Sequence, residues 1–86
     1  MVTVYVLRGD SGRRYVGITN NLPRRLNEHR SAGTSVSRML GDFRLIFTEE
    51  YTDHAQARIR EKFLKSGQGR KWLDEWENQA RPASGG

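Results

Sequence analysis

The chain contains no cysteine and no apolar run long enough to cross a bilayer. Without cysteine there is no disulfide framework and no thiolate metal site. The short apolar segment at residues 2–7 lacks the basic leader and the small-residue cleavage site of a signal peptide. These absences predict a soluble, cytoplasmic protein that does not associate with membranes.

Lysine is also scarce, because the chain has three lysines against twelve arginines. The net charge is +5 and the sequence pI is about 10.2. The planar fork of arginine matches phosphate bidentately, so an arginine-rich basic domain favours nucleic acid as its partner. A coding bias toward arginine is the alternative explanation of the excess.

The length of 86 residues allows one domain with a single modest core. Its composition is polar, with 35% hydrophobic and 29% charged residues, but the apolar residues recur periodically, which indicates folding rather than disorder. We expect the domain to occupy residues 1–79 and residues 80–86 to form a flexible tail. We expect a monomer, with a homodimer as the open alternative.

Three segments have the pattern of strands. Residues 2–7 carry apolar side chains on both alternating faces, which is typical of a central strand covered on both sides. A turn at residues 8–12 and a second strand at residues 13–19 complete an antiparallel hairpin. Residues 43–51 form the third strand, and a polar loop at residues 33–42 precedes it.

Three further segments have the pattern of helices. Asn20 and Asn21 cap the first, which tolerates Pro23 in its first turn and ends at Gly33. The second runs over residues 55–65, with Ala55, Ile59 and Phe63 as its predicted core stripe. The third covers residues 69–78, where Trp72 and Trp76 lie one turn apart and are expected in the core. The sequence therefore predicts a small α/β sandwich: a three-stranded, mostly antiparallel sheet flanked by helices, in the order strand, strand, helix, strand, helix, helix.

The hairpin brings two tyrosines to one face. If the turn at residues 8–12 places Leu7 opposite Arg13, Tyr5 lies directly across from Tyr15. Gly17 shares that face, and a glycine inside a strand often marks close approach by a ligand or another backbone. Sheet packing is the alternative explanation of the paired tyrosines.

The first helix adds two polar side chains. Leu22, Arg25, Leu26 and His29 fall on one side, so Arg25 and His29 flank the leucines that dock on the sheet and converge on the tyrosine face. Glu61 in the second helix is placed to hold a divalent cation through one carboxylate, with substrate phosphate and water as further ligands.

These groups suit phosphodiester hydrolysis, because a metal and an arginine neutralise charge on the phosphate while a phenol or imidazole handles the water. Each also has a structural alternative. Arg25 could be a solvated helix residue, His29 a packing residue, and Glu61 a partner of Arg58 or Lys65 in a surface ion pair.

The ordered set resembles the GIY-YIG nuclease superfamily, in particular its small single-domain bacterial members and the nuclease domain of the excinuclease C subunit. Its two motifs are read as Thr3-Val4-Tyr5 and Tyr15-Val16-Gly17, followed by "NNLPRRLNEHRSAG" and by "ARIREKFLKSGQGRKWL". The resemblance covers about residues 2–73. It implies a metal-dependent endonuclease that uses Mg²⁺ or Mn²⁺ to hydrolyse DNA.

The resemblance also implies a role for each matching residue. Tyr5 is the candidate general base or water-positioning phenol, and Tyr15 contacts the scissile phosphate. Arg25 stabilises the transition state, His29 assists proton transfer, and Glu61 binds the metal. Gly17 would let the substrate approach, and further contacts to the nucleic-acid backbone are expected from Arg13, Arg14, Arg38, Arg58, Arg60, Lys65, Arg70 and Lys71. Backbone contacts carry no sequence information, so weak sequence specificity is expected, with selection of branched or nicked DNA in repair or recombination.

Two other functions stay open at this stage. One is a catalytically weak nucleic-acid-binding module that keeps the fold and the basic surface. The other is a protein-interaction domain that docks through Trp72 and Trp76. Metal-dependent cleavage distinguishes the first of these from the nuclease, and loss of partner binding on changing Trp76 distinguishes the second.

Overall fold

The computed structural model describes residues 1–31 and 33–80. The chain forms, in order, β1 (Val2–Gly9), β2 (Arg14–Thr19), α1 (Leu22–Arg30), α2 (Ser35–Leu40), β3 (Phe43–Tyr51), α3 (His54–Lys65) and α4 (Gly67–Ala80). The predicted α/β sandwich is confirmed. In the described part of the chain, no helix is both long enough and apolar enough to span a membrane.

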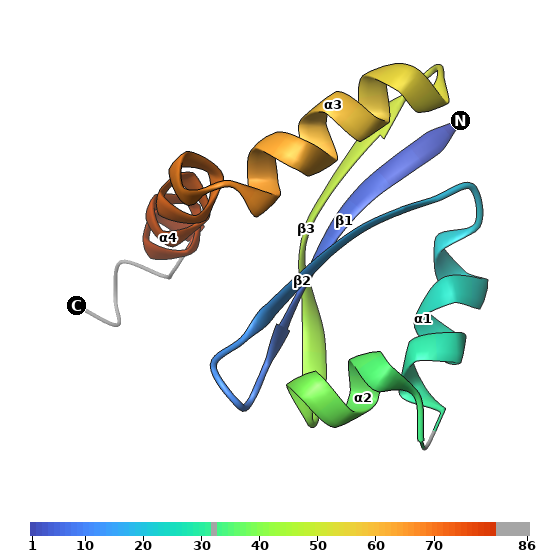
Figure 1. Cartoon of the computed structure of the whole chain (residues 1–86), viewed down its shortest axis with the longest axis vertical. Helices are drawn as coiled ribbons and strands as arrows, with labels where there is room; N and C mark the ends of the chain where they lie inside the picture. Colours follow the sequence, from blue (N-terminus) through green and yellow to red (C-terminus); the bar gives the residue numbers. More distant parts are fainter. Residues whose placement is uncertain (32, 81–86) are drawn as a thin grey trace.

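The sheet has three antiparallel strands in the order β2-β1-β3, so β1 is central as its two apolar faces predict. Val4 and Val6 point to one face and pack with residues of α3 and α4. Tyr5 and Leu7 point to the other face and pack with α1 and α2. Figure 1 shows these helix pairs on opposite sides of the sheet, which therefore separates two small cores.

The polar loop predicted at residues 33–42 is wrong, because residues 35–40 form α2. The Thr34 hydroxyl accepts a hydrogen bond from the Ser37 backbone N–H at 3.1 Å and so caps the helix. Val36 and Leu40 are buried one turn apart, and Gly41 ends the helix at a φ of 70°. The serines of the segment signalled a loop, but two apolar residues at helical spacing were enough for a short amphipathic helix.

The hairpin register differs from the predicted one by two residues. Leu7 lies opposite Tyr15, and Tyr5 lies opposite Gly17. The loop is closed by a hydrogen bond from the Gly9 N–H to the Arg13 carbonyl at 2.9 Å, so β1 extends two residues further toward the turn than expected. Because the shift is even, Tyr5 and Tyr15 keep a common face, but they are diagonal rather than directly paired.

The core stripe predicted for the second helix is also wrong. Ile59 is 70% exposed, whereas Ala57 and Leu64 are fully buried. A repeat of four residues drifts around an α-helix of 3.6 residues per turn, so the 55-59-63 series leaves the core while 57 and 64, two turns apart, stay in register. Phe63 is partly buried at the margin of the core.

Helix α4 begins two residues earlier than predicted and continues to Ala80. The indoles of Trp72 and Trp76 stack with ring centroids 5.9 Å apart, and Phe47 meets both edge-on. Trp72 packs against the core as expected, but Trp76 is 36% exposed and donates a hydrogen bond to the Ile46 carbonyl at 3.2 Å. Of the predicted tail, Ala80 is helical and residues 81–86 lie outside the described residues.

Candidate active site

Tyr5, Tyr15 and His29 form an aromatic cluster between the sheet and α1. The Tyr5 hydroxyl lies 2.8 Å from His29 Nε2, within hydrogen-bond distance. The Tyr15 ring is 6.1 Å from that of Tyr5 and meets the His29 ring edge-on at 5.1 Å. Leu22 and Leu26 of α1 pack against the same core, which is how the helix delivers His29 to the tyrosines.

Gly17 makes room for the Tyr5 phenol. A Cβ atom built on Gly17 would stand 2.6 Å from the Tyr5 hydroxyl oxygen and 3.0 Å from a ring carbon of Tyr15. Gly17 is itself buried. The close approach expected at this glycine is therefore made by Tyr5, which occupies the space that a side chain would fill.

Burial is the main cause that raises the pKa of the Tyr5 phenol above its usual range. The Tyr15 phenol and the Glu61 carboxylate raise this pKa further, while the Arg25 guanidinium lowers it. The pKa of His29 is lowered from 6.5, first by burial and then by Arg25. At neutral pH the pair is thus a neutral phenol and a neutral imidazole that can take up a proton.

Arg25 and Glu61 bring the two charges of the candidate site. Arg25 lies one turn before His29 on α1, and its half-exposed guanidinium is 3.3 Å from Glu28. The Glu61 side chain is only 13% exposed and accepts a hydrogen bond from Lys65 Nζ at 3.0 Å. The surface pair with Lys65 that the helical spacing allows does form, and the charges of Glu61 and Arg25 both reach Tyr5.

Within the described residues, a divalent cation would find a single carboxylate, that of Glu61, rather than a cluster of protein ligands. Among residues 1–31 and 33–80, no three His, Asp or Glu side chains gather closely enough to hold a metal ion. Glu61 offers a single carboxylate of low exposure, which suits Mg²⁺ or Mn²⁺ bound mainly by water and substrate phosphate. Lys65 binds the Oε2 atom of this carboxylate, so a cation would bind through Oε1 or displace Lys65.

The predicted nucleic-acid contacts fall into three groups. Arg13, Lys65 and Arg70 line a groove of about 630 Å³ that also includes Tyr15, and Arg38 and Lys71 are exposed elsewhere. Arg14 and Arg60 are instead engaged within the protein. Arg60 pairs with Glu49 at 3.0 Å and lies over the Trp72 ring at 4.7 Å.

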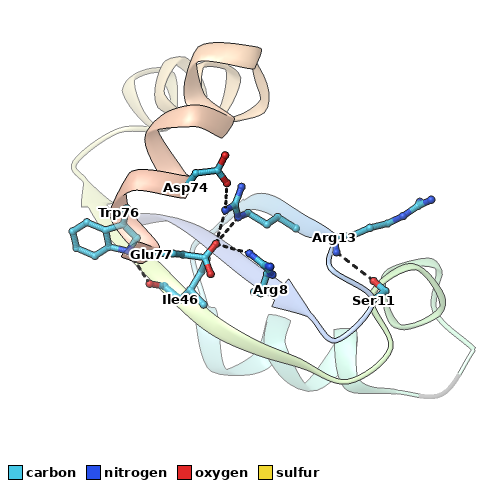
Figure 2. A network of polar contacts seen from close by, with 8 residues as sticks. Arg8, Ser11, Arg13, Ile46, Asp74, Trp76 and Glu77 are labelled. Atoms are coloured by element: carbon cyan, nitrogen blue, oxygen red, sulfur yellow. Dashed lines mark hydrogen bonds and ion pairs between the residues drawn. The ribbon is translucent and has the colours of Figure 1, made fainter. Parts of the chain in front are cut away.

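Arg14 belongs to an ion-pair network that ties β2 to α4 (Figure 2). Its guanidinium contacts Asp74 at 2.6 Å and Glu77 at 2.5 Å, and Glu77 also binds Arg8 at 2.8 Å. The Arg14 side chain is 15% exposed, so the nucleic-acid contact expected of it competes with two carboxylates. Figure 2 shows Arg13, its neighbour, extending away from this network.

Glu77 is the residue of this region that the sequence prediction omitted. Its only sequence signal was the three-residue spacing from Asp74, which places two carboxylates on one side of α4. That spacing does not identify partners more than sixty residues away, such as Arg14.

The candidate site thus combines two tyrosines of the sheet, a histidine and an arginine one turn apart on α1, and a carboxylate of α3. A family model described as the GIY-YIG catalytic domain matches residues 1–73. The chain belongs to this family.

Individual relatives are small proteins of the group named UPF0213. The chain is 36% identical over 55 residues to one from Klebsiella pneumoniae, covering 63% of this chain and 52% of the relative. It is 38% identical over 69 residues to one from Orgyia pseudotsugata multicapsid polyhedrosis virus, covering 78% and 66%. A third, from Desulfotalea psychrophila, is 34% identical over 64 residues, covering 72% and 58%. The chain thus spans about half to two thirds of the length of these relatives.

A solved structure supports the same grouping. The solution NMR structure of a UPF0213 protein from Bacillus halodurans is 28% identical to the chain and superimposes with a TM-score of 0.56. The match covers 96% of this chain and 98% of that protein.

Proposed function

We propose that the domain is a metal-dependent endonuclease that hydrolyses DNA phosphodiester bonds with little sequence preference and acts on branched or nicked DNA in repair or recombination. The observation that carries this proposal is the hydrogen bond between Tyr5 and His29, 2.8 Å long, in the field of Arg25 and Glu61. In this arrangement the buried Tyr5 phenol is the proton donor and His29 is the proton acceptor. Arg25 is the nearby cation and Glu61 the nearby anion.

The proton chemistry follows from the two pKa directions. The phenol of Tyr5 is neutral at pH 7, which favours positioning of the attacking water over direct deprotonation. Neutral His29 takes the proton that the water loses as its oxygen bonds to phosphorus, with the Tyr5 hydroxyl between them as the relay. The phosphodiester bond to the leaving oxygen then breaks, and that oxygen takes up a proton from solvent.

The charge on the phosphate needs compensation from outside this pair. Arg25, half-exposed at the edge of the cluster, is free to exchange Glu28 for a phosphate oxygen. Glu61 would hold Mg²⁺ or Mn²⁺, which supplies Lewis-acid stabilisation of the phosphoryl charge when bound. Tyr15, at the margin of the groove, would contact the phosphate from the other side.

The test is cleavage of labelled single-stranded, duplex, flapped and four-way DNA with Mg²⁺, Mn²⁺ or EDTA. We expect cleavage only with metal, and a loss of about 10²–10³-fold in Glu61→Gln, comparable to removal of one group that stabilises transition-state charge. The matched control is Glu75→Gln, an exposed carboxylate of α4. Equal cleavage by wild type and Glu61→Gln would contradict the proposal.

A catalytically weak binding module is the second candidate, and the ion pair of Glu61 with Lys65 favours it, because that lysine occupies one of the two oxygens of the carboxylate that would bind a metal. In that case all substrates bind in a salt-sensitive manner, metal does not change their affinity, and no product forms.

A further inference from the structure

We infer that the groove beside Tyr15 is a track for a single DNA strand that leads into the candidate active site. This inference rests on the proposed function, because it makes the candidate active site the place to which the groove leads the strand. The groove has a volume of about 630 Å³ and lies along β2, next to the end of α3 and the first turns of α4. Tyr15 belongs both to this groove and to the cluster with Tyr5 and His29.

The charge of the groove is positive. Arg13, Lys65 and Arg70 line it from three different elements or loops. In the part of the chain that the structure describes, Arg13 and Arg70 form no ion pair, and both are exposed. The nearby carboxylates of Asp74 and Glu77 are already bound by Arg14 and Arg8. Among the described residues, Arg13 and Arg70 are thus the groove cations without a neutralising carboxylate, whereas Lys65 pairs with Glu61.

The size of the groove suits a single strand. A volume of this order is that of a pocket for one drug-sized molecule, so the groove holds one or two nucleotides of one strand at a time. A basic groove whose lining includes an aromatic residue is the arrangement that follows a single-stranded backbone, because cations pair with phosphates and an aromatic ring stacks on a base. Tyr15, only partly buried, is the ring available for this.

The ion-pair network gives the groove a fixed width. Arg14 lines the groove but is anchored to Asp74 and Glu77 of α4, so β2 and α4 are joined directly beside it. Gly69 packs so closely on α3 that an added Cβ would stand 1.9 Å from the Phe63 carbonyl oxygen, which holds the start of α4 against the end of α3. Arg70 is therefore presented from a rigid junction.

The experiment measures binding in EDTA, so that cleavage does not enter. The probe is a fluorescein-labelled oligothymidylate of about 15 nucleotides, the upper range of single-strand site sizes. The double variant Arg13→Ala/Arg70→Ala is compared with Arg24→Ala/Arg44→Ala, which removes the same charge from exposed arginines outside the groove. Affinity is measured against salt concentration, and thermal unfolding verifies that both variants fold.

We expect the slope of log affinity against log salt to fall by about 1.4 in the groove variant, since each lost phosphate contact on a single strand removes about 0.7. The control variant and binding of a blunt DNA hairpin should change much less. Equal losses in both variants would overturn the groove assignment, and an equal loss for the hairpin would overturn the single-strand assignment. Competition by poly-glutamate as strong as by oligothymidylate would also overturn it, because it would reduce the groove to a site for acidic peptides.

The two proposals fail separately. A wild type that never cleaves DNA but shows the altered salt slope refutes the nuclease and keeps the groove. A wild type that cleaves with metal while the groove variant binds and cleaves normally keeps the nuclease and refutes the groove.

Discussion

The environment of Tyr5 depends on the absence of a side chain at Gly17. It is 1% exposed, stands over Gly17 on the neighbouring strand and reaches His29 on α1. A larger residue at position 17 would compete with the phenol for the same space. The glycine of the second motif thus serves the tyrosine of the first, and this relation depends on the register of the hairpin.

Gly17→Ala should therefore disturb the candidate site strongly, although the substitution adds only one methyl group. The new methyl group would overlap the Tyr5 hydroxyl, so the ring must move away from His29. We expect a loss of about 1–3 kcal/mol in the free energy of unfolding, as for overpacked cores, together with loss of cleavage. Urea unfolding measures the first effect.

The matched control for this substitution is Gly67→Ala, since nothing lies within 4 Å of a Cβ at that position. It should leave stability nearly unchanged. A Gly17→Ala protein as stable and as active as wild type would show that Tyr5 and Gly17 are not in the contact described.

At the scale of elements, α4 is attached to the sheet by polar as well as apolar contacts. Leu73 and Trp72 pack on the core, and Glu77 binds two arginines from β1 and β2. The Trp76 indole covers the Ile46 carbonyl beside the irregularity in the pairing of β1 and β3. That contact occupies a backbone acceptor on an outer strand, which hinders edge-to-edge association with another sheet.

Glu77→Gln should loosen this attachment. The substitution keeps the shape of the side chain but removes the charge that compensates Arg8 and Arg14, and the Glu77 side chain is only 17% exposed. We expect a loss of about 1–3 kcal/mol in the free energy of unfolding, the cost of leaving a charged hydrogen-bonding group without its partner.

Glu75→Gln on the exposed side of α4 is the control and should stay within about 0.5 kcal/mol of wild type, as is usual at the surface. Because the network borders the groove, the affinity of the Glu77 variant for oligothymidylate should also differ from that of wild type. Unchanged stability in both variants would mean that the network contributes nothing to the attachment of α4.

At the scale of the whole molecule, two small cores share one sheet, and His29 is buried beside the core that contains Tyr5. Its pKa is lower in the folded protein than its ordinary value of 6.5. The unfolded chain therefore binds more protons than the folded chain as pH falls below neutrality.

The free energy of unfolding should accordingly be highest above pH 6.5 and should fall as pH decreases toward the folded-state pKa of His29. Cleavage should fall over the same range, because protonated His29 cannot accept the proton from Tyr5. Urea unfolding at a series of pH values measures the stability of wild type, of His29→Gln and of His54→Gln, whose histidine is exposed on α3. The His29 variant should lose most of this slope and the His54 variant should keep it; the reverse pattern would contradict the assignment.

Much of this arrangement could be predicted from local pattern. The two apolar faces of residues 2–7 identified the central strand, and helical spacing placed Arg25 and His29 beside the leucines that dock on the sheet. The face shared by Tyr5 and Tyr15 was predicted even though their register was not. A shift of two residues along a strand does not change the face to which a side chain points. These features depend on contacts between near neighbours in the chain.

Other features depended on contacts between distant residues. The sequence by itself determined the sheet with helices on both faces, the basic character and the set of tyrosine, arginine, histidine and glutamate. Only the tertiary structure decided that Gly17 accommodates Tyr5, that Ile59 faces solvent, and that Arg14 is held by Asp74 and Glu77. The physical reason is that periodicity fixes which side a residue faces, whereas packing and charge compensation fix what it meets there.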